Sequence, residues 1–334
     1  MTSCATAKSS NWWRSSREGR QMSNYVCFKC RQPAVFRMRH HRLAFCRQHY
    51  LDWFVEQTQH VIEKYHMFEP RERILVAVSG GKDSLALWDV LWRLGYPADG
   101  LYINLGIESS QAEYSNESEE YARAFAQQNG LTLRVVNVQE SYGQTIPQFA
   151  SRSQRGRVKP CGVCGLVKRH VMNQVARDFD YTVLTTAHNL DDEVAVLMGN
   201  TITWQVDLLK RQSPILPAED GFVRKAKPFC RFYERETAAY TLLRGIEYEE
   251  DECPHAVGSK QLVFKDILNK LEETTPGIKM NFYASFLNAR GDGFFAPQGQ
   301  DGEPASRDLH RCPNCGQPTT SPDLCAFCRL TKAA

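Results

Sequence analysis

The chain has 334 residues, of which 42% are hydrophobic and 24% are charged, and its formal net charge is +3. This composition predicts a soluble protein with one α/β domain and one or two small modules. No segment approaches the roughly 18 apolar residues of a membrane-spanning helix, and residues 1–20 are too polar for a secretory signal. We therefore expect a cytoplasmic protein without a membrane partner.

The twelve cysteines indicate metal sites and not disulfides, because a chain of this size without a signal is expected in a reducing compartment. Residues 1–24 show no periodic pattern and are left unassigned. Residues 25–50 contain Cys27 and Cys30, then Cys46 and His49, at the spacing of a structural zinc finger. Its basic residues predict either a surface for RNA phosphates or a merely solvated face. They are Arg37, Arg39, His40, His41, Arg42 and Arg47.

A strand, a glycine loop and a helix follow a predicted linking helix within residues 51–73. The strand is the aliphatic run 74–78, and the helix covers residues 85–94. Glycines after a buried strand let backbone N–H groups approach phosphate oxygens at the start of a helix. The loop departs from the Walker pattern. Its residues are Ser79, Gly80, Gly81, Lys82, Asp83 and Ser84.

The alternation of strands and helices continues along the chain. Strands are predicted at residues 101–105, 131–138 and 181–186, and helices at 113–128, 166–178 and from 190. This order predicts a parallel sheet covered on both faces, with ligands beyond the carboxyl ends of its strands. A helical extension completes a domain of residues 74–290, and residues 291–310 are a linker rich in Gly and Pro.

The last module, residues 311–330, repeats the zinc-site spacing. Its four cysteines predict a zinc ribbon, and a complete ligand set leaves no open position for catalysis. They are Cys312, Cys315, Cys325 and Cys328.

Three inner cysteines stand apart from these modules. Cys161 and Cys164 precede the helix predicted at 166–178, and Cys253 lies in the helical extension. Three thiolates can hold a [4Fe-4S] cluster and leave one iron open to a sulfur atom. A redox dithiol or a persulfide on one of these cysteines explains the spacing equally well.

The ordered set of motifs resembles the TtuA family of tRNA 2-thiouridine synthetases, which are PP-loop ATP pyrophosphatases, over about residues 25–330. Such a set is far more specific than any one motif. The segments that carry the resemblance are CFKC…CRQH, AVSGGKDSL, PCGVCG with Lys168 after it, TAHNLDDEV, ECPH, PGIK and CPNC…CAFC.

The resemblance implies a Rossmann-like PP-loop domain with ATP on residues 79–84, a [4Fe-4S] cluster on Cys161, Cys164 and Cys253, and two structural Zn²⁺ ions. It also implies a homodimer and a ubiquitin-like, thiocarboxylated sulfur carrier as partner. Lys168, Asp191 and Asp192 are expected to be catalytic helpers. Physically, an acidic side chain beyond a strand end can hold Mg²⁺ or orient the base, whereas both aspartates can also simply favour the positive end of a helix.

The expected reaction is adenylation of the C2 oxygen of a tRNA uridine, followed by replacement of AMP by sulfur from the open iron. One rival is another PP-loop thiolase, which acts on cytidine or uses a persulfide without a cluster. A second rival is a non-catalytic zinc-ribbon protein that binds RNA.

Overall fold

The computed structural model describes residues 25–108, 114–152, 156–157, 159–219, 221–251, 253–255, 260–295 and 309–332. The unassigned extension of residues 1–24 and most of the predicted linker lie outside these residues. The chain divides into two compact units, Met1–Trp53 and Phe54–Ala334. The division falls within helix α1 (Arg47–Lys64).

The first unit is built around a short hairpin. Strands β1 (Phe36–Met38) and β2 (Leu43–Phe45) pair antiparallel, with Phe36 opposite Phe45. The ring of Tyr50, at the start of α1, is fully buried and lies 4.7 Å from the ring of Phe36. Helix α1 begins at Arg47, before the predicted residue 51, because its first three residues, Arg, Gln and His, are polar and add nothing to the apolar periodicity. His49 therefore lies on a helix.

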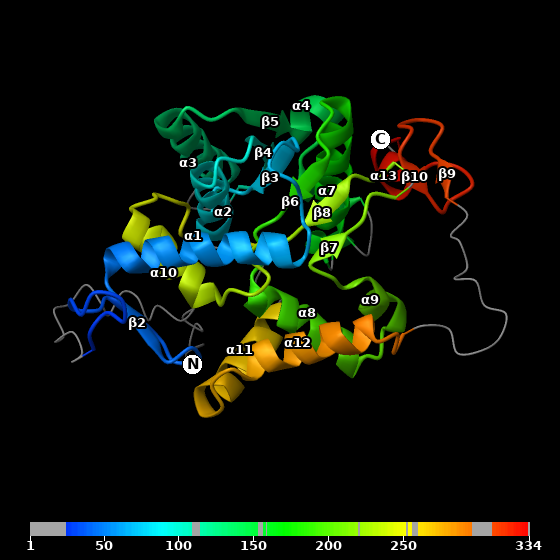
Figure 1. The fold of residues 1–334 in the computed structure, drawn as a ribbon. Helices are drawn as coiled ribbons and strands as arrows, with labels where there is room; N and C mark the ends of the chain where they lie inside the picture. The colour runs from blue at the N-terminus through cyan, green and yellow to red at the C-terminus, as the bar shows by residue number, and fades with distance from the viewer. Residues whose placement is uncertain are drawn as a thin grey trace, which may run out of the picture. The chain divides into compact units, whose positions relative to one another are not determined.

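The described part of the second unit contains a six-stranded sheet in the order β5-β4-β3-β6-β8-β7 (Figure 1). All neighbouring strands are parallel except β7, which runs antiparallel to β8. The predicted parallel α/β sheet is thus confirmed, and β7 and β8 are additions to it. The strands are β3 (Ile74–Val78), β4 (Ala98–Asn104), β5 (Leu133–Asn137), β6 (Val183–Thr185), β7 (Ile215–Leu216) and β8 (Arg224–Ala226).

The connections wind in two directions from β3. Helices α2 (Lys82–Arg93) and α3 (Tyr114–Asn129) lead from β3 through β4 to β5, and α7 (Pro160–Asp178) leads back to β6. Right-handed crossovers place α2 and α3 on one face of the sheet and α7 on the other. The strand order therefore reverses between β3 and β6, where ligands of such sheets bind. Short helices α4 (Val138–Tyr142) and α5 (Ile146–Ser151) precede α7.

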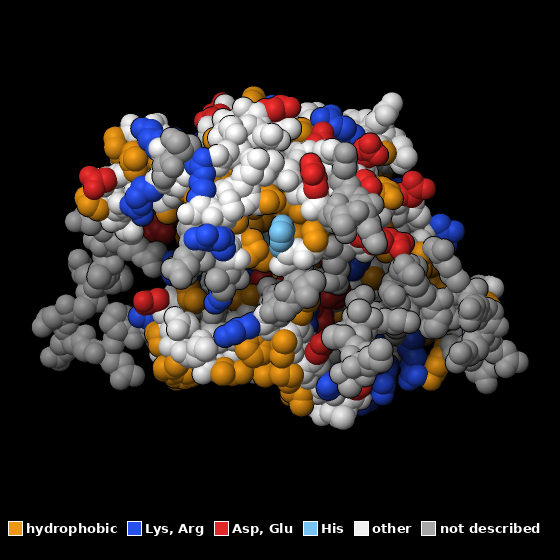
Figure 2. Space-filling model, turned by 180° about the vertical axis from the view of Figure 1, so that it is seen from behind, with side chains coloured by type: hydrophobic (Ala, Val, Ile, Leu, Met, Phe, Trp, Pro, Cys, Tyr) orange, Lys and Arg blue, Asp and Glu red, His pale blue; other side chains and the backbone are white. Residues whose placement is uncertain are grey.

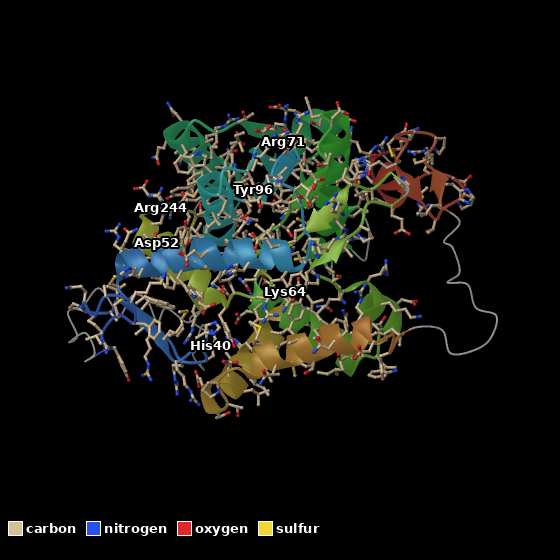
Figure 3. The ribbon with its side chains drawn as sticks, in the orientation of Figure 1. His40, Asp52, Lys64, Arg71, Tyr96 and Arg244 are labelled. Carbon is tan, nitrogen blue, oxygen red and sulfur yellow. The ribbon has the colours of Figure 1, made fainter. Side chains whose placement is uncertain are left out.

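The predicted helical extension brings later residues back to the sheet. Helix α10 packs on α2, while α11 and α12 pack on α8. Beside the sheet, Tyr96, labelled in Figure 3, donates a hydrogen bond of 3.1 Å to Gln59 of α1. The helices are α8 (Leu190–Ile202), α9 (Val206–Arg211), α10 (Glu234–Arg244), α11 (Lys260–Thr274) and α12 (Ile278–Gly291).

The end of the chain forms a small module of β9 (His310–Arg311), β10 (Pro318–Thr319) and α13 (Ala326–Lys332). Helix α13 packs on α7, so this module shares the core of the second unit. Among the described helices, none combines the length and the hydrophobicity that crossing a bilayer requires.

Candidate functional site

The glycine loop lies at the carboxyl end of β3, where the sheet reverses its winding. Gly80 has φ +80°, and a Cβ atom there would lie 2.2 Å from the carbonyl oxygen of Ser118 on α3, so only glycine fits. Ser84 accepts a hydrogen bond of 3.1 Å from the N–H of Ser79 and donates one of 2.9 Å to the carbonyl of Gly81. The Ser84 hydroxyl thus closes the loop.

Lys82 lies between two carboxylates. Its Nζ is 2.8 Å from Asp83 and 3.0 Å from Glu234, the first residue of α10. Burial lowers the pKa of Lys82, but the two carboxylates outweigh it and raise the pKa above its usual value. Thr237 donates a hydrogen bond to the second oxygen of Asp83. The ammonium group therefore stays charged beside the glycine loop.

Glu234 links Lys82 to the segment after β6. Its second oxygen is 3.1 Å from Lys265, which also contacts Asp192 at 2.7 Å. Burial raises the pKa of Glu234, but the charges of Lys82 and Lys265 prevail and lower it to about 2. The result is a continuous chain of alternating charges from the loop to α8.

Asp191 is part of a second, buried ion pair. One of its oxygens is 2.5 Å from Nζ of Lys279, the lysine of the PGIK segment, and the other accepts a hydrogen bond of 2.8 Å from the N–H of Glu234. Asp192 also accepts a hydrogen bond from the N–H of Asn189 in a capping box at the start of α8. Both aspartates thus have protein partners, which favours the structural alternative for them.

The inner cysteines come together with Lys168. Cys161 and Cys164 lie in the first turns of α7, which begins at Pro160 and not at the predicted residue 166. Burial raises the pKa of Cys164, the ammonium of Lys168 opposes this, and nearby Cys253 and Cys161 raise it further. The thiol of Cys161 also lies 3.4 Å from the carbonyl oxygen of His255. Segments distant in sequence therefore place three thiols and one cation in a single site.

The spacing of these three thiols differs from that of the outer cysteines. Among the described residues, the groups whose ligand atoms lie within 4.8 Å of one another do not include Cys161, Cys164 or Cys253. A single zinc ion requires such close ligands, whereas a cluster places several iron and sulfide atoms between its thiolates. In the described residues, the three thiols therefore do not form the compact ligand set of a single zinc ion.

The loop before Cys253 contacts the glycine loop directly. The N–H of Glu249 donates a hydrogen bond of 3.0 Å to the carbonyl oxygen of Gly80. Acidic side chains of this loop and of α3 line a pocket of about 540 Å³. The segment that leads to Cys253 is therefore joined to the glycine loop by a backbone hydrogen bond.

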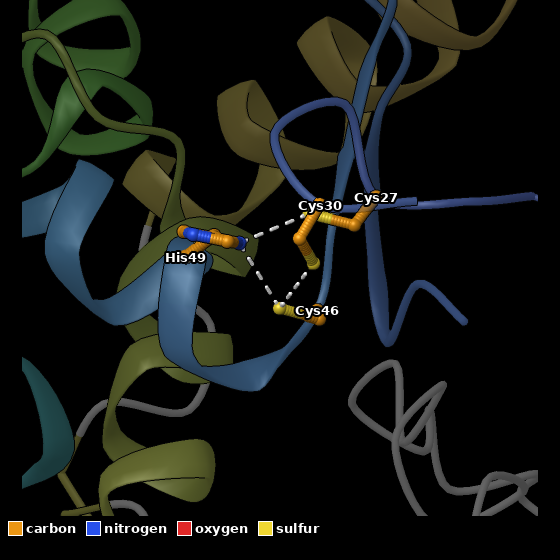
Figure 4. A group of neighbouring side chains, drawn as sticks. All are labelled: Cys27, Cys30, Cys46 and His49. Atoms are coloured by element: carbon orange, nitrogen blue, oxygen red, sulfur yellow. Dashed lines mark hydrogen bonds between the residues drawn. The ribbon is translucent and has the colours of Figure 1, made fainter. Parts of the chain in front are cut away.

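The N-terminal module, defined by its four predicted ligands Cys27, Cys30, Cys46 and His49, has these side chains converging (Figure 4). Nδ1 of His49 lies 3.3 Å from the sulfur of Cys27 and 3.4 Å from that of Cys46. Burial raises the pKa of Cys27, but hydrogen bonds from backbone N–H groups prevail and lower it to about 6. A metal-binding thiolate is thus favoured near neutral pH.

The C-terminal module, defined by Cys312, Cys315, Cys325 and Cys328, repeats this arrangement. The sulfurs of Cys315 and Cys325 are 3.7 Å apart. Despite burial, backbone hydrogen bonds lower the pKa of Cys312 to about 6. Both predicted ligand sets are therefore assembled and suited to a metal ion with four protein ligands.

The surface of the N-terminal module combines basic and aromatic side chains. Arg37, Arg39 and Arg42 are exposed, and Phe28, between two of the cysteines, is 67% exposed. The guanidinium of Arg37 stacks 4.0 Å above the ring of Tyr25. Exposed rings beside arginines are a common feature of single-stranded RNA sites.

Sequence reasoning missed Glu234, Lys265 and Lys279. Each lies in a segment predicted only as helical, where a charged residue is expected on the solvated side. No local signal distinguishes them, except that Lys279 lies in the quoted PGIK segment.

Comparison with known proteins adds two family matches and several relatives. A model of the PP-loop domain matches residues 51–256, and a model of the N-terminal LIM domain of the 2-thiouridine synthetase TtuA matches residues 26–51. The chain is 50% identical to the tRNA-5-methyluridine(54) 2-sulfurtransferase of Thermus thermophilus, covering 92% of this chain and 91% of the relative. It is 38% identical to the protein of the same name from Thermotoga maritima, covering 92% and 96%.

A solved structure supports the fold. The U34-tRNA thiolase NcsA from Methanococcus maripaludis, solved with its [4Fe-4S] cluster, matches with a TM-score of 0.70 at 22% identity. The match covers 81% of this chain and 89% of that protein.

Proposed function

Since this chain belongs to the TtuA family of PP-loop tRNA sulfurtransferases, we propose that it forms 2-thiouridine by adenylating the C2 oxygen of a tRNA uridine and replacing that oxygen with sulfur. The enzyme is a tRNA 2-thiolation sulfurtransferase of the PP-loop class. The structural observation that carries the proposed mechanism is the hydrogen bond between Glu249 and Gly80, because it joins the nucleotide loop to the cysteine site.

ATP binds to the loop of residues 79–84 at the end of β3. The N-terminus of α2 and the ammonium of Lys82 face the phosphates, and Lys82 exchanges its bond to Glu234 for a phosphate oxygen. The uridine C2 oxygen then attacks the α-phosphate, and pyrophosphate leaves. Mg²⁺ accompanies the nucleotide, and Asp83 and Glu234 are the carboxylates nearest to Lys82.

The thiols of Cys161, Cys164 and Cys253 supply the three thiolates that a [4Fe-4S] cluster with one open iron requires, and Cys164 lies near the other two. When bound by three thiolates, such a cluster supplies an iron without a protein ligand, which can hold the sulfur. Lys168 lies beside Cys164 and offsets negative charge there. Sulfur attacks C2 of the adenylated base, and AMP leaves with the former base oxygen.

Asp191 and Asp192 act on this reaction through their ion pairs. Lys279 holds Asp191, which in turn holds the N–H of Glu234, and Lys265 joins Asp192 to the same glutamate. Both aspartates therefore position Glu234 and Lys82. A direct catalytic role for them stays a prediction.

Each outer module holds one structural Zn²⁺, because four ligand atoms within 4.8 Å of one another satisfy a tetrahedral ion.

The basic and aromatic surface of the N-terminal module binds tRNA phosphates and an unstacked base. The names of the two bacterial relatives favour position 54 as the target.

The proposed partners are a ubiquitin-like sulfur carrier with a C-terminal thiocarboxylate and a second copy of the chain. A dimer is supported by exposed hydrophobic side chains on α8, α9 and α11. Figure 2 shows hydrophobic side chains gathered along the lower edge of one face. The most exposed large hydrophobic residues of these helices are Ile202, Val263, Leu271 and Leu208; Trp204, between α8 and α9, is also exposed.

The proposed reaction is tested with purified protein that has been reconstituted anaerobically with iron and sulfide and is then incubated with tRNA, ATP, Mg²⁺ and sodium sulfide as the sulfur source. We expect 2-thiouridine, AMP and pyrophosphate in equal amounts, and about four iron atoms per chain. Product from a protein without iron, together with a persulfide found by alkylation and mass spectrometry, would support the cluster-free alternative. Formation of thiolated cytidine instead of thiolated uridine would contradict the proposal that uridine is the target base.

A further inference from the structure

Helix α7 carries two sets of functional side chains on opposite faces. At 3.6 residues per turn, Cys161, Cys164 and Lys168 fall on one narrow stripe. His170, Asn173 and Arg177 fall on the opposite stripe, about half a turn away. The first stripe faces the inner cysteine site, and the second contacts the C-terminal module. Contacts that fix the orientation of α7 on the stripe of His170 therefore also fix the direction in which Cys161, Cys164 and Lys168 point.

The contacts between α7 and the C-terminal module are specific. The ring of His170 stacks on Phe327 with centroids 3.6 Å apart and planes inclined by 9°. Buried Gln317 donates a hydrogen bond of 3.1 Å to the carbonyl oxygen of His170 and accepts one of 3.4 Å from Asn173. One turn further along the helix, Arg177 donates to the carbonyl of Gly316 at 3.5 Å.

The module and the helix also share one hydrophobic core. The core joins three valines of α7 to three of the four cysteines of the module and to Phe327. Interiors of this kind are close-packed, so displacement of one side shifts the other. The core residues in question are Val167, Val171, Val175, Cys312, Cys325, Phe327 and Cys328.

The start of α7 needs such support, because its own sequence is a poor helix former. Its first two turns contain Gly162 and Gly165, each of which costs about 1 kcal/mol relative to alanine. The N-cap residue Lys159 makes no capping hydrogen bond with its side chain. The position of the two inner cysteines on this helix must therefore come from tertiary packing.

We propose that the C-terminal module is a brace for α7, and that Gln317 and Phe327 are positioning residues for Cys161, Cys164 and Lys168. Metal binding at the outer cysteines thereby orders the inner cysteine site. The module supplies only part of the core that it shares with α7, and four cysteines around one metal ion hold its two turns together, so metal loss weakens the brace. The further expectation that the module promotes cluster assembly rests on the proposed function, in which the inner cysteines bind the cluster.

Hydrogen exchange in the full-length, cluster-free protein tests the brace directly. We expect Phe327→Ala and Gln317→Ala to increase amide exchange several-fold in residues 161–168. Thr319→Ala is the matched control, because it removes only a turn hydrogen bond within the same module, to the N–H of Ser321. Zinc content shows that the module of each variant is still assembled. Unchanged exchange in residues 161–168 of both test variants would overturn the proposal.

Iron binding tests whether the C-terminal module orders the inner cysteine site. Cys325→Ala and Cys46→Ala each remove one ligand of an outer module, but only the first belongs to the module that packs on α7. We expect anaerobic reconstitution to load less iron into Cys325→Ala than into Cys46→Ala, with a weaker cluster absorption band. Equal loading of the two variants would contradict the proposed link. A wild-type protein that takes up no iron would instead contradict the cluster, while the exchange experiment would still decide the brace.

Discussion

The backbone N–H of Glu249 donates a hydrogen bond of 3.0 Å to the carbonyl oxygen of Gly80, which ties the loop that leads to Cys253 to the nucleotide loop. Gly80 is also fixed from its other side, because Ser118 leaves no room for a Cβ atom. Gly80 therefore lies between α3 and the segment that leads to Cys253. This relationship is consistent with an enzyme that activates a base with ATP and immediately delivers sulfur to it.

Glu249→Pro removes this N–H and should weaken the link. A hydrogen bond of this kind contributes about 0.5 to 1.5 kcal/mol, so we expect a loss of about twofold to thirteenfold in kcat/KM for ATP. Glu249→Ala keeps the backbone donor and is the control. Steady-state release of AMP measures the effect, and an equal loss in both variants would assign it to the side chain.

Asp191 and Lys279 form a buried ion pair, and breaking it from one side should be costly. Lys279→Met leaves the carboxylate buried without its cation and should destabilise the protein by about 3 to 5 kcal/mol in urea unfolding. The double variant Asp191→Asn with Lys279→Met should recover part of this stability. If Asp191 only positions Glu234, thiolation recovers together with stability. Recovered stability without recovered thiolation would establish a catalytic role for Asp191.

His170 should make stability depend on pH. Burial lowers the pKa of His170 to about 4, so the folded protein holds this ring neutral. Its contribution to stability is complete above about pH 6.5 and is lost as the pH falls towards 4, because the unfolded chain binds the proton first. His170→Phe keeps a ring against Phe327 but cannot titrate. Between pH 7 and pH 4, we expect the free energy of unfolding of the wild-type protein to fall by at most about 3 kcal/mol more than that of this variant. If denaturant unfolding gives the same dependence of the unfolding free energy on pH for both proteins, His170 is not the group responsible.

The two outer modules should each account for one zinc ion. We expect metal analysis to find two zinc ions per wild-type chain and one in either Cys46→Ala or Cys328→Ala. Exposed Cys161 provides the control, because Cys161→Ala should leave the zinc content unchanged while reducing iron. Zinc lost from Cys161→Ala would show that the inner cysteines bind zinc instead.

The sequence predicted those parts of the structure that are determined by residues close together in the chain. The aliphatic run of β3 and the glycines after it determine a strand and a loop without help from distant residues. The start of α7 was placed too late, because Gly162 and Gly165 interrupt the hydrophobic periodicity. Strands β7 and β8 were missed because β7 has only two residues and β8, with the sequence Arg-Lys-Ala, has no hydrophobic run such as that of β6.

The ion-pair chain at the site was beyond local reasoning. Glu234 lies 152 residues from Lys82 in sequence, and only the packing of α10 on α2 brings them together. The same holds for Asp191, whose acidic side chain at a helix start already has a sufficient local explanation. Its contact with Lys279 becomes visible only when α12 packs on α8.

The most direct test of the account is mass spectrometry of nucleosides from total tRNA of the source organism, with and without this gene. The account predicts that deletion removes one 2-thiouridine derivative, that the wild-type gene restores it, and that Lys82→Ala, which lacks the cation of the nucleotide loop, does not. An unchanged set of thionucleosides after deletion, or full restoration by Lys82→Ala, would contradict ATP-dependent tRNA thiolation by this enzyme.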